Sequence, residues 1–152
     1  KKNDLHQNQI IKIEFDDAGN LKYNKHSLSP SRELYMHSFL LTNEKFSNKD
    51  KFVIHAHPPN VISYMGFDKF RELNTIKDVF PEINVGNIGK NVIYHDAGSL
   101  DLAKNCYDNL INHDLVGLEK HGTLSIDSDS DKIIEDIETL EYYIGSYLKA
   151  EN

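Results

Sequence analysis

The sequence has little cysteine and no long apolar run. Cys106 is the one cysteine among 152 residues. A single cysteine cannot form an internal disulfide, so we expect the chain in a reducing compartment, the cytoplasm. Cys106 lies in a stretch with helical periodicity, where a small core residue is the expected role. No apolar run approaches the roughly 18 residues that a membrane-spanning helix needs, so no membrane association is expected.

Positive charge is also scarce. Lysine and arginine total 17 against 24 acidic residues, which gives a formal net charge of −7. The basic residues are scattered, whereas a protein that binds nucleic acid needs a basic stripe to neutralise phosphates. Nucleic acid is therefore not an expected partner. A small anionic substrate remains compatible with this charge, because local donors and a metal ion outweigh the mean field.

Hydrophobic periodicity and turn residues predict one α/β domain over residues 1–152. Expected strands cover residues 10–15, 21–23, 51–56, 91–95 and 115–126, the last as two strands that meet at a turn near Gly122. Expected helices cover residues 29–43, 58–66, 99–113 and 130–152, with Ser29 and Ser99 as N-caps and Pro30 at the first helical position. Hairpin and turn signals separate several strands, so the sheet is not built from plain βαβ units.

Two histidines stand one residue apart in "FVIHAHPPN", residues 52–60. Alternation along the strand places His55 and His57 on the same face, close enough to share a metal ion. Two prolines end the strand just beyond them and leave the pair at its open end. The pattern alone is weak, because a polar strand end with two ordinary histidines gives the same letters.

A third histidine, His121, stands beside Gly122 at the end of another expected strand. Gly122 permits a tight turn or a close approach of the backbone. Three histidines with one open position form a catalytic zinc arrangement, whereas structural zinc sites are usually closed by cysteines. Glu33 falls in the first turn of its expected helix. It is either a partner of the helix dipole or a catalytic carboxylate, and spacing does not decide between them.

Three stretches resemble, in order and in separation, the three motifs of the class II aldolase/adducin family: "SPSRELYMH" (29–37), "KFVIHAHPPNVIS" (51–63) and "GLEKHGTLSI" (117–126). The stretch "HDAGSLDLAKN" (95–105) resembles the segment that precedes the family's helix between the second and third motifs. The resemblance implies a three-layer α/β/α sandwich around a largely antiparallel sheet, usually assembled into tetramers. It covers nearly the whole chain.

Residue by residue, the resemblance implies that His55, His57 and His121 are ligands of zinc or another divalent metal. It implies that Glu33 is the catalytic carboxylate. Ser31 matches a serine that contacts the substrate phosphate in the aldolases. Arg32 stands where the family often has a second serine, and an arginine can also bind phosphate, bidentately.

The resemblance implies a zinc-dependent aldolase that cleaves a ketose 1-phosphate to dihydroxyacetone phosphate and an aldehyde. The implied substrate is a small phosphorylated sugar, and the implied assembly is a homotetramer. Family members carry a further N-terminal segment with no counterpart here, so we expect a chain truncated relative to the family. The alternatives are a sugar-phosphate epimerase or dehydratase of the same family, a non-catalytic adducin-like scaffold, or an inactive fragment.

Some residues have no role that the sequence decides. His37 could orient Glu33 or have a structural role in its helix. Tyr64 and Tyr94 could reach the substrate, and the sequence does not choose between them. The helix expected over residues 130–152 has a wide apolar stripe extended by tyrosines. Broad aromatic surface is commonly buried by a partner subunit, although the same tyrosines could cover the domain's own sheet.

Overall fold

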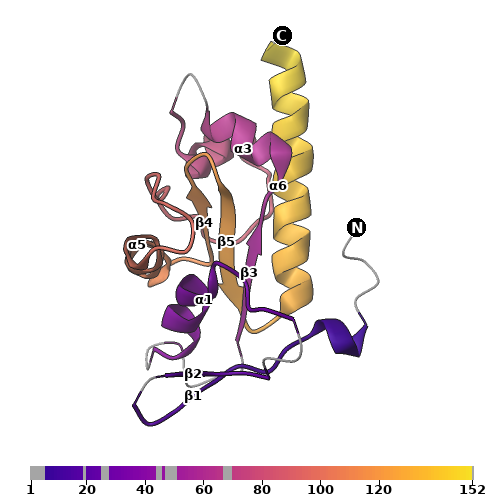
Figure 1. The fold of residues 1–152 in the computed structure, drawn as a ribbon. Coiled ribbons are helices and arrows are strands. Elements are labelled where there is room, and N and C mark those ends of the chain that lie inside the picture. Colours follow the sequence, from indigo (N-terminus) through magenta and orange to yellow (C-terminus); the bar gives the residue numbers. More distant parts are fainter. Residues whose placement is uncertain are drawn as a thin grey trace.

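The computed structural model describes residues 6–18, 20–24, 28–43, 46, 51–66 and 70–151. This part of the chain holds two antiparallel sheets. A hairpin joins β1 (Glu14–Phe15) to β2 (Leu21–Lys22). The main sheet has the order β3-β5-β4, with β3 over Phe52–Ala56, β4 over Leu115–Leu118 and β5 over Gly122–Asp127 (Figure 1).

Helices cover both faces of the main sheet. The described helices are α1 (Leu34–Leu41), α3 (Pro59–Met65), α4 (Ile76–Val79), α5 (Leu100–Leu110) and α6 (Ser130–Glu151), with short 3-10 turns at Gln7–Gln9 and Leu73–Thr75. α3 and α6 pack against one face, and α1 and α5 against the other (Figure 1). None of the described helices is long and apolar enough to cross a membrane.

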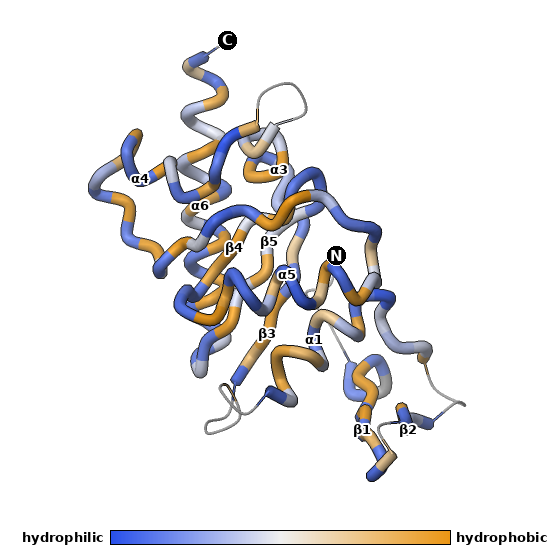
Figure 2. Tube along the Cα trace, turned by 90° about the vertical axis from the view of Figure 1, so that its left-hand side faces the viewer, coloured by the Kyte–Doolittle hydropathy of each residue, from blue (hydrophilic) through white to orange (hydrophobic). Residues whose placement is uncertain are grey.

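The core forms two clusters, one on each side of the main sheet. One joins α3 and α6 to the sheet. The helical spacing of the sequence predicts an apolar stripe on α6, of which Ile133, Ile137, Leu140 and Ile144 are buried and Leu148 is partly buried. The other joins α1 and α5 to the opposite face and includes the buried Cys106, as predicted. Figure 2 shows hydrophobic residues running along β3 and β4 between the helices. The predicted class, helices on both faces of a largely antiparallel sheet, is confirmed.

Three predicted elements differ from the structure. The strand expected over residues 10–15 is limited to Glu14–Phe15. The helix expected from residue 29 begins at Leu34 with Glu33 as its N-cap, so the prediction for Ser29 and Pro30 was wrong. The reason is a turn before the helix, in which the Leu34 N–H donates to the Ser31 carbonyl. The strand expected over residues 91–95 is also wrong, because only Val92 forms an isolated bridge, parallel to Leu118.

The tyrosines of α6 have different surroundings. Tyr143 and Tyr147 pack on the domain itself, with ring centroids 5.1 and 6.5 Å from that of Phe80. The Tyr142 side chain points outward and is 72% exposed. The helix ends at Glu151, and the last predicted helical residue, 152, lies outside the described residues.

Candidate functional site

Antiparallel pairing of β3 with β5 brings the three predicted histidines together. His55 is in β3, His57 follows its last residue, and His121 immediately precedes β5. The register places Ala56 opposite Thr123, so the open end of β3 lies beside the start of β5. One ligand nitrogen from each histidine can be chosen so that all three lie within 4.8 Å of one another.

Gly122 makes this approach possible. A Cβ atom on residue 122 would lie 2.1 Å from the Ala56 carbonyl oxygen and 2.9 Å from Cδ2 of His57. Both distances are far below van der Waals contact, so any side chain would force the two strands apart. The sequence expectation of a close backbone approach at Gly122 is thus confirmed, and the turn itself lies over residues 118–121.

The backbone of β5 fixes the tautomer of His55. Nδ1 of His55 lies 2.9 Å from the Thr123 carbonyl oxygen. A carbonyl can only accept, so Nδ1 carries the hydrogen and the lone pair is on Nε2. Burial lowers the pKa of His55 to about 4. The hydrogen bond to Thr123 raises this pKa, and the neighbouring imidazoles lower it further. His55 is therefore a neutral imidazole with its free nitrogen directed toward His57.

The nitrogen pair between His55 and His57 has the chemistry of a metal site. Their Nε2 atoms lie 2.8 Å apart, so one proton on His57 bridges them. A metal ion can replace this proton, because metal binding requires neutral imidazoles and releases protons. Burial also lowers the pKa of His121, although Glu33 opposes the shift. Three imidazole nitrogens suit zinc and related transition metals rather than calcium or magnesium, which prefer oxygen ligands.

Glu33 lies beside this histidine cluster. It is 6% exposed, and its Oε1 is 3.9 Å from Nε2 of His121. Its other oxygen, Oε2, accepts a hydrogen bond from the Gly98 N–H at 3.1 Å. Glu33 occupies the N-cap position of α1, but its side chain makes no capping hydrogen bond. The carboxylate instead contacts His121 and the Gly98 N–H. Because His121 is neutral, the contact between them is not an ion pair at neutral pH.

A single cavity of about 790 Å³ contains every predicted site residue. Its lining is Ser31, Arg32, Glu33, His37, His55, Ala56, His57, Ala97 and His121. Ser31 and Arg32 are exposed at this cavity, and the Ser31 hydroxyl accepts from the Glu33 N–H at 3.2 Å. The same turn that begins α1 therefore places Ser31, Arg32 and Glu33 at this cavity.

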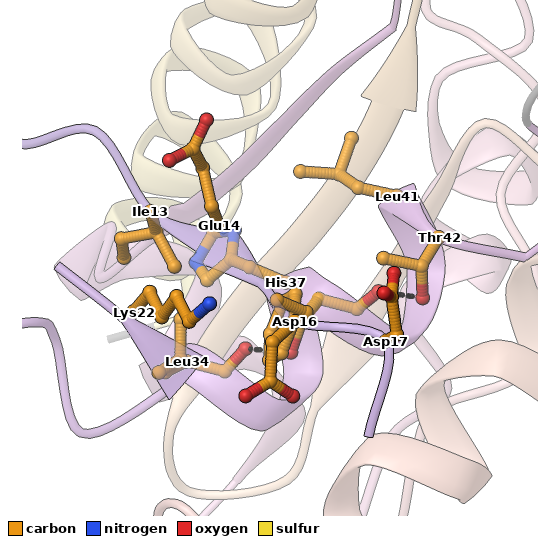
Figure 3. Close-up of a pocket in the computed structure, with 11 residues that line it drawn as sticks. Ile13, Glu14, Asp16, Asp17, Lys22, Leu34, His37, Leu41 and Thr42 are labelled. Carbon is orange, nitrogen blue, oxygen red and sulfur yellow. Dashed lines mark hydrogen bonds between the residues drawn. The ribbon is translucent and has the colours of Figure 1, made fainter. Parts of the chain in front are cut away.

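His37 separates this cavity from another, of about 710 Å³, between the β1–β2 hairpin and α1. Figure 3 shows His37 among Ile13 and Glu14 of the hairpin side and Leu34 of the helix. Burial lowers the pKa of His37, so a neutral ring forms this partition.

The two tyrosines left open by the sequence do not line the candidate site. The Tyr64 hydroxyl is 2.9 Å from that of Thr75, and its ring packs against Tyr147 in the core. Tyr94 is 56% exposed, and its N–H donates to Glu119.

Sequence reasoning missed Thr123 and Gly98. Thr123 acts through its backbone carbonyl, which leaves no signal in the identity of the residue. Gly98 stands directly before the N-cap Ser99, and a glycine there indicates a special backbone conformation. Which carboxylate its N–H would meet depends on the tertiary fold.

Comparison with known proteins decides the family. Residues 1–148 match the Class II Aldolase and Adducin N-terminal domain. The chain belongs to this family. Class II aldolases are metal-dependent, and the His55, His57 and His121 group could hold a metal ion.

Rhamnulose-1-phosphate aldolase of Bacteroides thetaiotaomicron is 26% identical over 156 residues, which cover 97% of this chain and 58% of that protein. A sugar-phosphate aldolase from Thermotoga maritima has a TM-score of 0.68 at 22% identity, covering 86% of this chain and 59% of the other. An L-fuculose 1-phosphate aldolase has a TM-score of 0.59 at 23% identity, and the match covers 92% of this chain and 62% of the aldolase. The chain thus spans about three fifths of these relatives, and the solved structures share its fold.

Proposed function

We propose that this class II aldolase family member is a metal-dependent aldehyde-lyase. The proposed reaction cleaves a ketose 1-phosphate to dihydroxyacetone phosphate and an aldehyde. The observation that carries the proposal is the shared cavity, in which three imidazoles lie beside the buried carboxylate of Glu33. A scaffold of the same fold would have no use for that combination.

His55, His57 and His121 would hold the metal, zinc or another divalent ion. When bound, the metal supplies a Lewis acid that draws electrons from the substrate's carbonyl group. The ligands add no negative charge, so the full positive charge of the ion remains available at the site. The hydrogen bond to the Thr123 carbonyl keeps His55 in the tautomer that has its lone pair on Nε2, the nitrogen that would bind the metal.

Glu33 is the proposed acid–base group. In cleavage, its protonated form gives a proton to the carbon released from the broken bond; in synthesis, the carboxylate removes that proton. Only Oε1 faces the histidines, because Oε2 is held by Gly98. General acid–base groups of this kind contribute about 10²–10⁴-fold to a rate.

The phosphate of the substrate would bind at the Ser31 and Arg32 end of the cavity. Arg32 provides the positive charge there, within a chain whose net charge is −7. A guanidinium can donate two parallel hydrogen bonds to a phosphate, and the Ser31 hydroxyl can donate a third. This arrangement favours a phosphorylated sugar over a free one.

The proposed enzyme is cytoplasmic and forms a homo-oligomer, a tetramer. The exposed Tyr142 and Ile134 on α6 support an interface there, at 72% and 46% exposure. Sedimentation at tens of micromolar protein tests this, and a monomer under those conditions would contradict it.

A coupled assay for dihydroxyacetone phosphate tests the reaction. The metal-loaded protein is incubated with the 1-phosphates of fuculose and rhamnulose and with ribulose phosphates. We expect release from a deoxy-ketose 1-phosphate, and a loss of at least about 10²-fold in Glu33→Gln. The amide of this variant can still accept from Gly98, so its melting temperature should change little. Epimerisation of a pentulose phosphate without release would move the protein to the epimerase branch. Near-normal activity of Glu33→Gln would refute the role of Glu33.

A further inference from the structure

The loop before α5 closes directly on Glu33. Residues 96–99 form a turn in which the Ser99 N–H donates to the Asp96 carbonyl at 3.1 Å. Gly98 occupies the third position of this turn with a φ of +79°. That position of a type II turn needs a positive φ and therefore favours glycine.

Close packing fixes the turn against the residue that precedes Glu33. A Cβ atom on Gly98 would lie 2.6 Å from the Arg32 carbonyl oxygen, so only glycine fits without displacement. Ser99 then caps α5 by accepting from the Leu102 N–H at 3.1 Å, which ties the turn to a helix packed in the core. The Gly98 N–H is thus held rigidly, and it donates to Oε2 of Glu33.

One bond of this kind distinguishes the two oxygens of the carboxylate. Oε2 is held on the side of the Gly98 loop, which leaves Oε1 on the side of His121. Without the Gly98 bond, the carboxylate could rotate about its last side-chain torsion, which is broad for glutamate. The bond therefore determines which oxygen meets a proton on the substrate.

We propose that Gly98 is a positioning residue, whose N–H holds Oε2 of Glu33 so that Oε1 is the oxygen that exchanges the proton. This role rests on the proposed function of Glu33. In the synthetic direction, a C–H bond at the hydroxymethyl carbon of dihydroxyacetone phosphate breaks. The proton bonds to Oε1, and the electron pair moves toward the substrate's carbonyl. In deuterated water the reverse transfer delivers deuterium to the same carbon, so no aldehyde is needed to observe the step.

The contact is tested first by NMR, independently of catalysis. The chain has 8 glycines, so selective ¹⁵N-glycine labelling gives a spectrum in which Gly98 can be assigned by its loss in Gly98→Ala. Removing the acceptor with Glu33→Ala should shift the Gly98 amide resonance more than that of any other glycine. An unmoved Gly98 resonance would overturn the proposal.

The positioning is tested by hydrogen–deuterium exchange into dihydroxyacetone phosphate with metal-loaded protein. We expect Gly98→Ala to slow exchange by about 10–100-fold, because misplacing a catalytic group by about 1 Å can have such an effect. The loss should fall on kcat more than on KM for dihydroxyacetone phosphate, with metal content unchanged.

Gly66→Ala is the matched control, because Gly66 also has a positive φ, +91°, but ends α3. It should exchange at nearly the wild-type rate. An equal loss in the two alanine variants, or a wild-type rate in Gly98→Ala, would overturn the positioning role. No exchange by wild type, or full exchange by Glu33→Gln, would instead refute the proposed function of Glu33 and this role with it, whatever the NMR shows of the contact.

Discussion

Gly122→Ala places a methyl group at the point where β5 approaches the end of β3. The new Cβ would start 2.1 Å from the Ala56 carbonyl oxygen and 2.9 Å from Cδ2 of His57. The nearest contact is backbone, which cannot rotate away as a side chain can. Relief therefore requires a strand displacement of about 1 Å before ordinary contact distances return.

The displacement affects stability and metal binding differently. Overpacking of a well-packed site typically lowers the free energy of unfolding by about 1–3 kcal/mol. For a domain of this size each kcal/mol lowers the melting temperature by roughly 2–4 °C. Metal–ligand distances tolerate only about 0.2 Å, so a shift of His57 relative to His121 should weaken zinc binding by at least about 10-fold.

Calorimetric melting of the metal-free protein and a competitive zinc titration measure the two effects of Gly122→Ala. Gly89→Ala is a matched control, because its Cβ would meet Asn109 and His113 at 3.0 Å, away from the cluster. It should lose some stability and keep zinc affinity. Unchanged zinc affinity in Gly122→Ala would refute the inference that this approach brings the histidines together.

Zinc at about 100 times its Kd should stabilise the fold by about 2.7 kcal/mol and raise the melting temperature by several degrees. His57→Ala should abolish this rise in melting temperature. The control His6→Ala, which changes an exposed histidine, should keep it. The metal-free protein should lose stability as pH falls from 6.5 toward 4. In this range His55 binds a proton in the unfolded state but not in the folded state, where its pKa is about 4. The loss of stability is measured from denaturant midpoints at pH 7 and 5 and should be smaller in His55→Ala. An identical loss in this variant would contradict the lowered pKa of His55. Burial raises the pKa of Cys106 to about 12. A thiol reagent should therefore label Cys106 only as fast as unfolding exposes it. Rapid labelling of the native protein would argue against a core position.

Local sequence patterns predicted most of the fold. The spacing of Ile133 to Ile144 gave the buried face of α6, and Ser99 caps α5 as expected. The start of α1 was misplaced because Ser31, Pro30 and Ser29 all suit a helix start, and the competing turn at Ser31 leaves no stronger signal. Residues 91–95 have strand-like composition, but only Val92 pairs, and the Tyr94 N–H donates instead to the side chain of Glu119.

The candidate site was predictable in its members and not in its geometry. His-x-His at a strand end and a histidine before Gly122 indicate metal ligands, and the family resemblance selected Glu33. The contacts that orient them come from backbone groups of Thr123 and Gly98, so side-chain identity does not reveal which histidine or carboxylate each group meets. Such contacts depend on strand register and turn conformation, so they required the structure.

X-ray absorption at the zinc edge tests the central claim, that His55, His57 and His121 form one metal centre with an open position. For the zinc-loaded protein, we predict about three imidazole nitrogens at roughly 2.0–2.1 Å, together with an oxygen ligand. The spectrum of His57→Ala should lose one imidazole or the bound metal altogether. A wild-type spectrum dominated by oxygen ligands, or one that His57→Ala leaves unchanged, would contradict the claim.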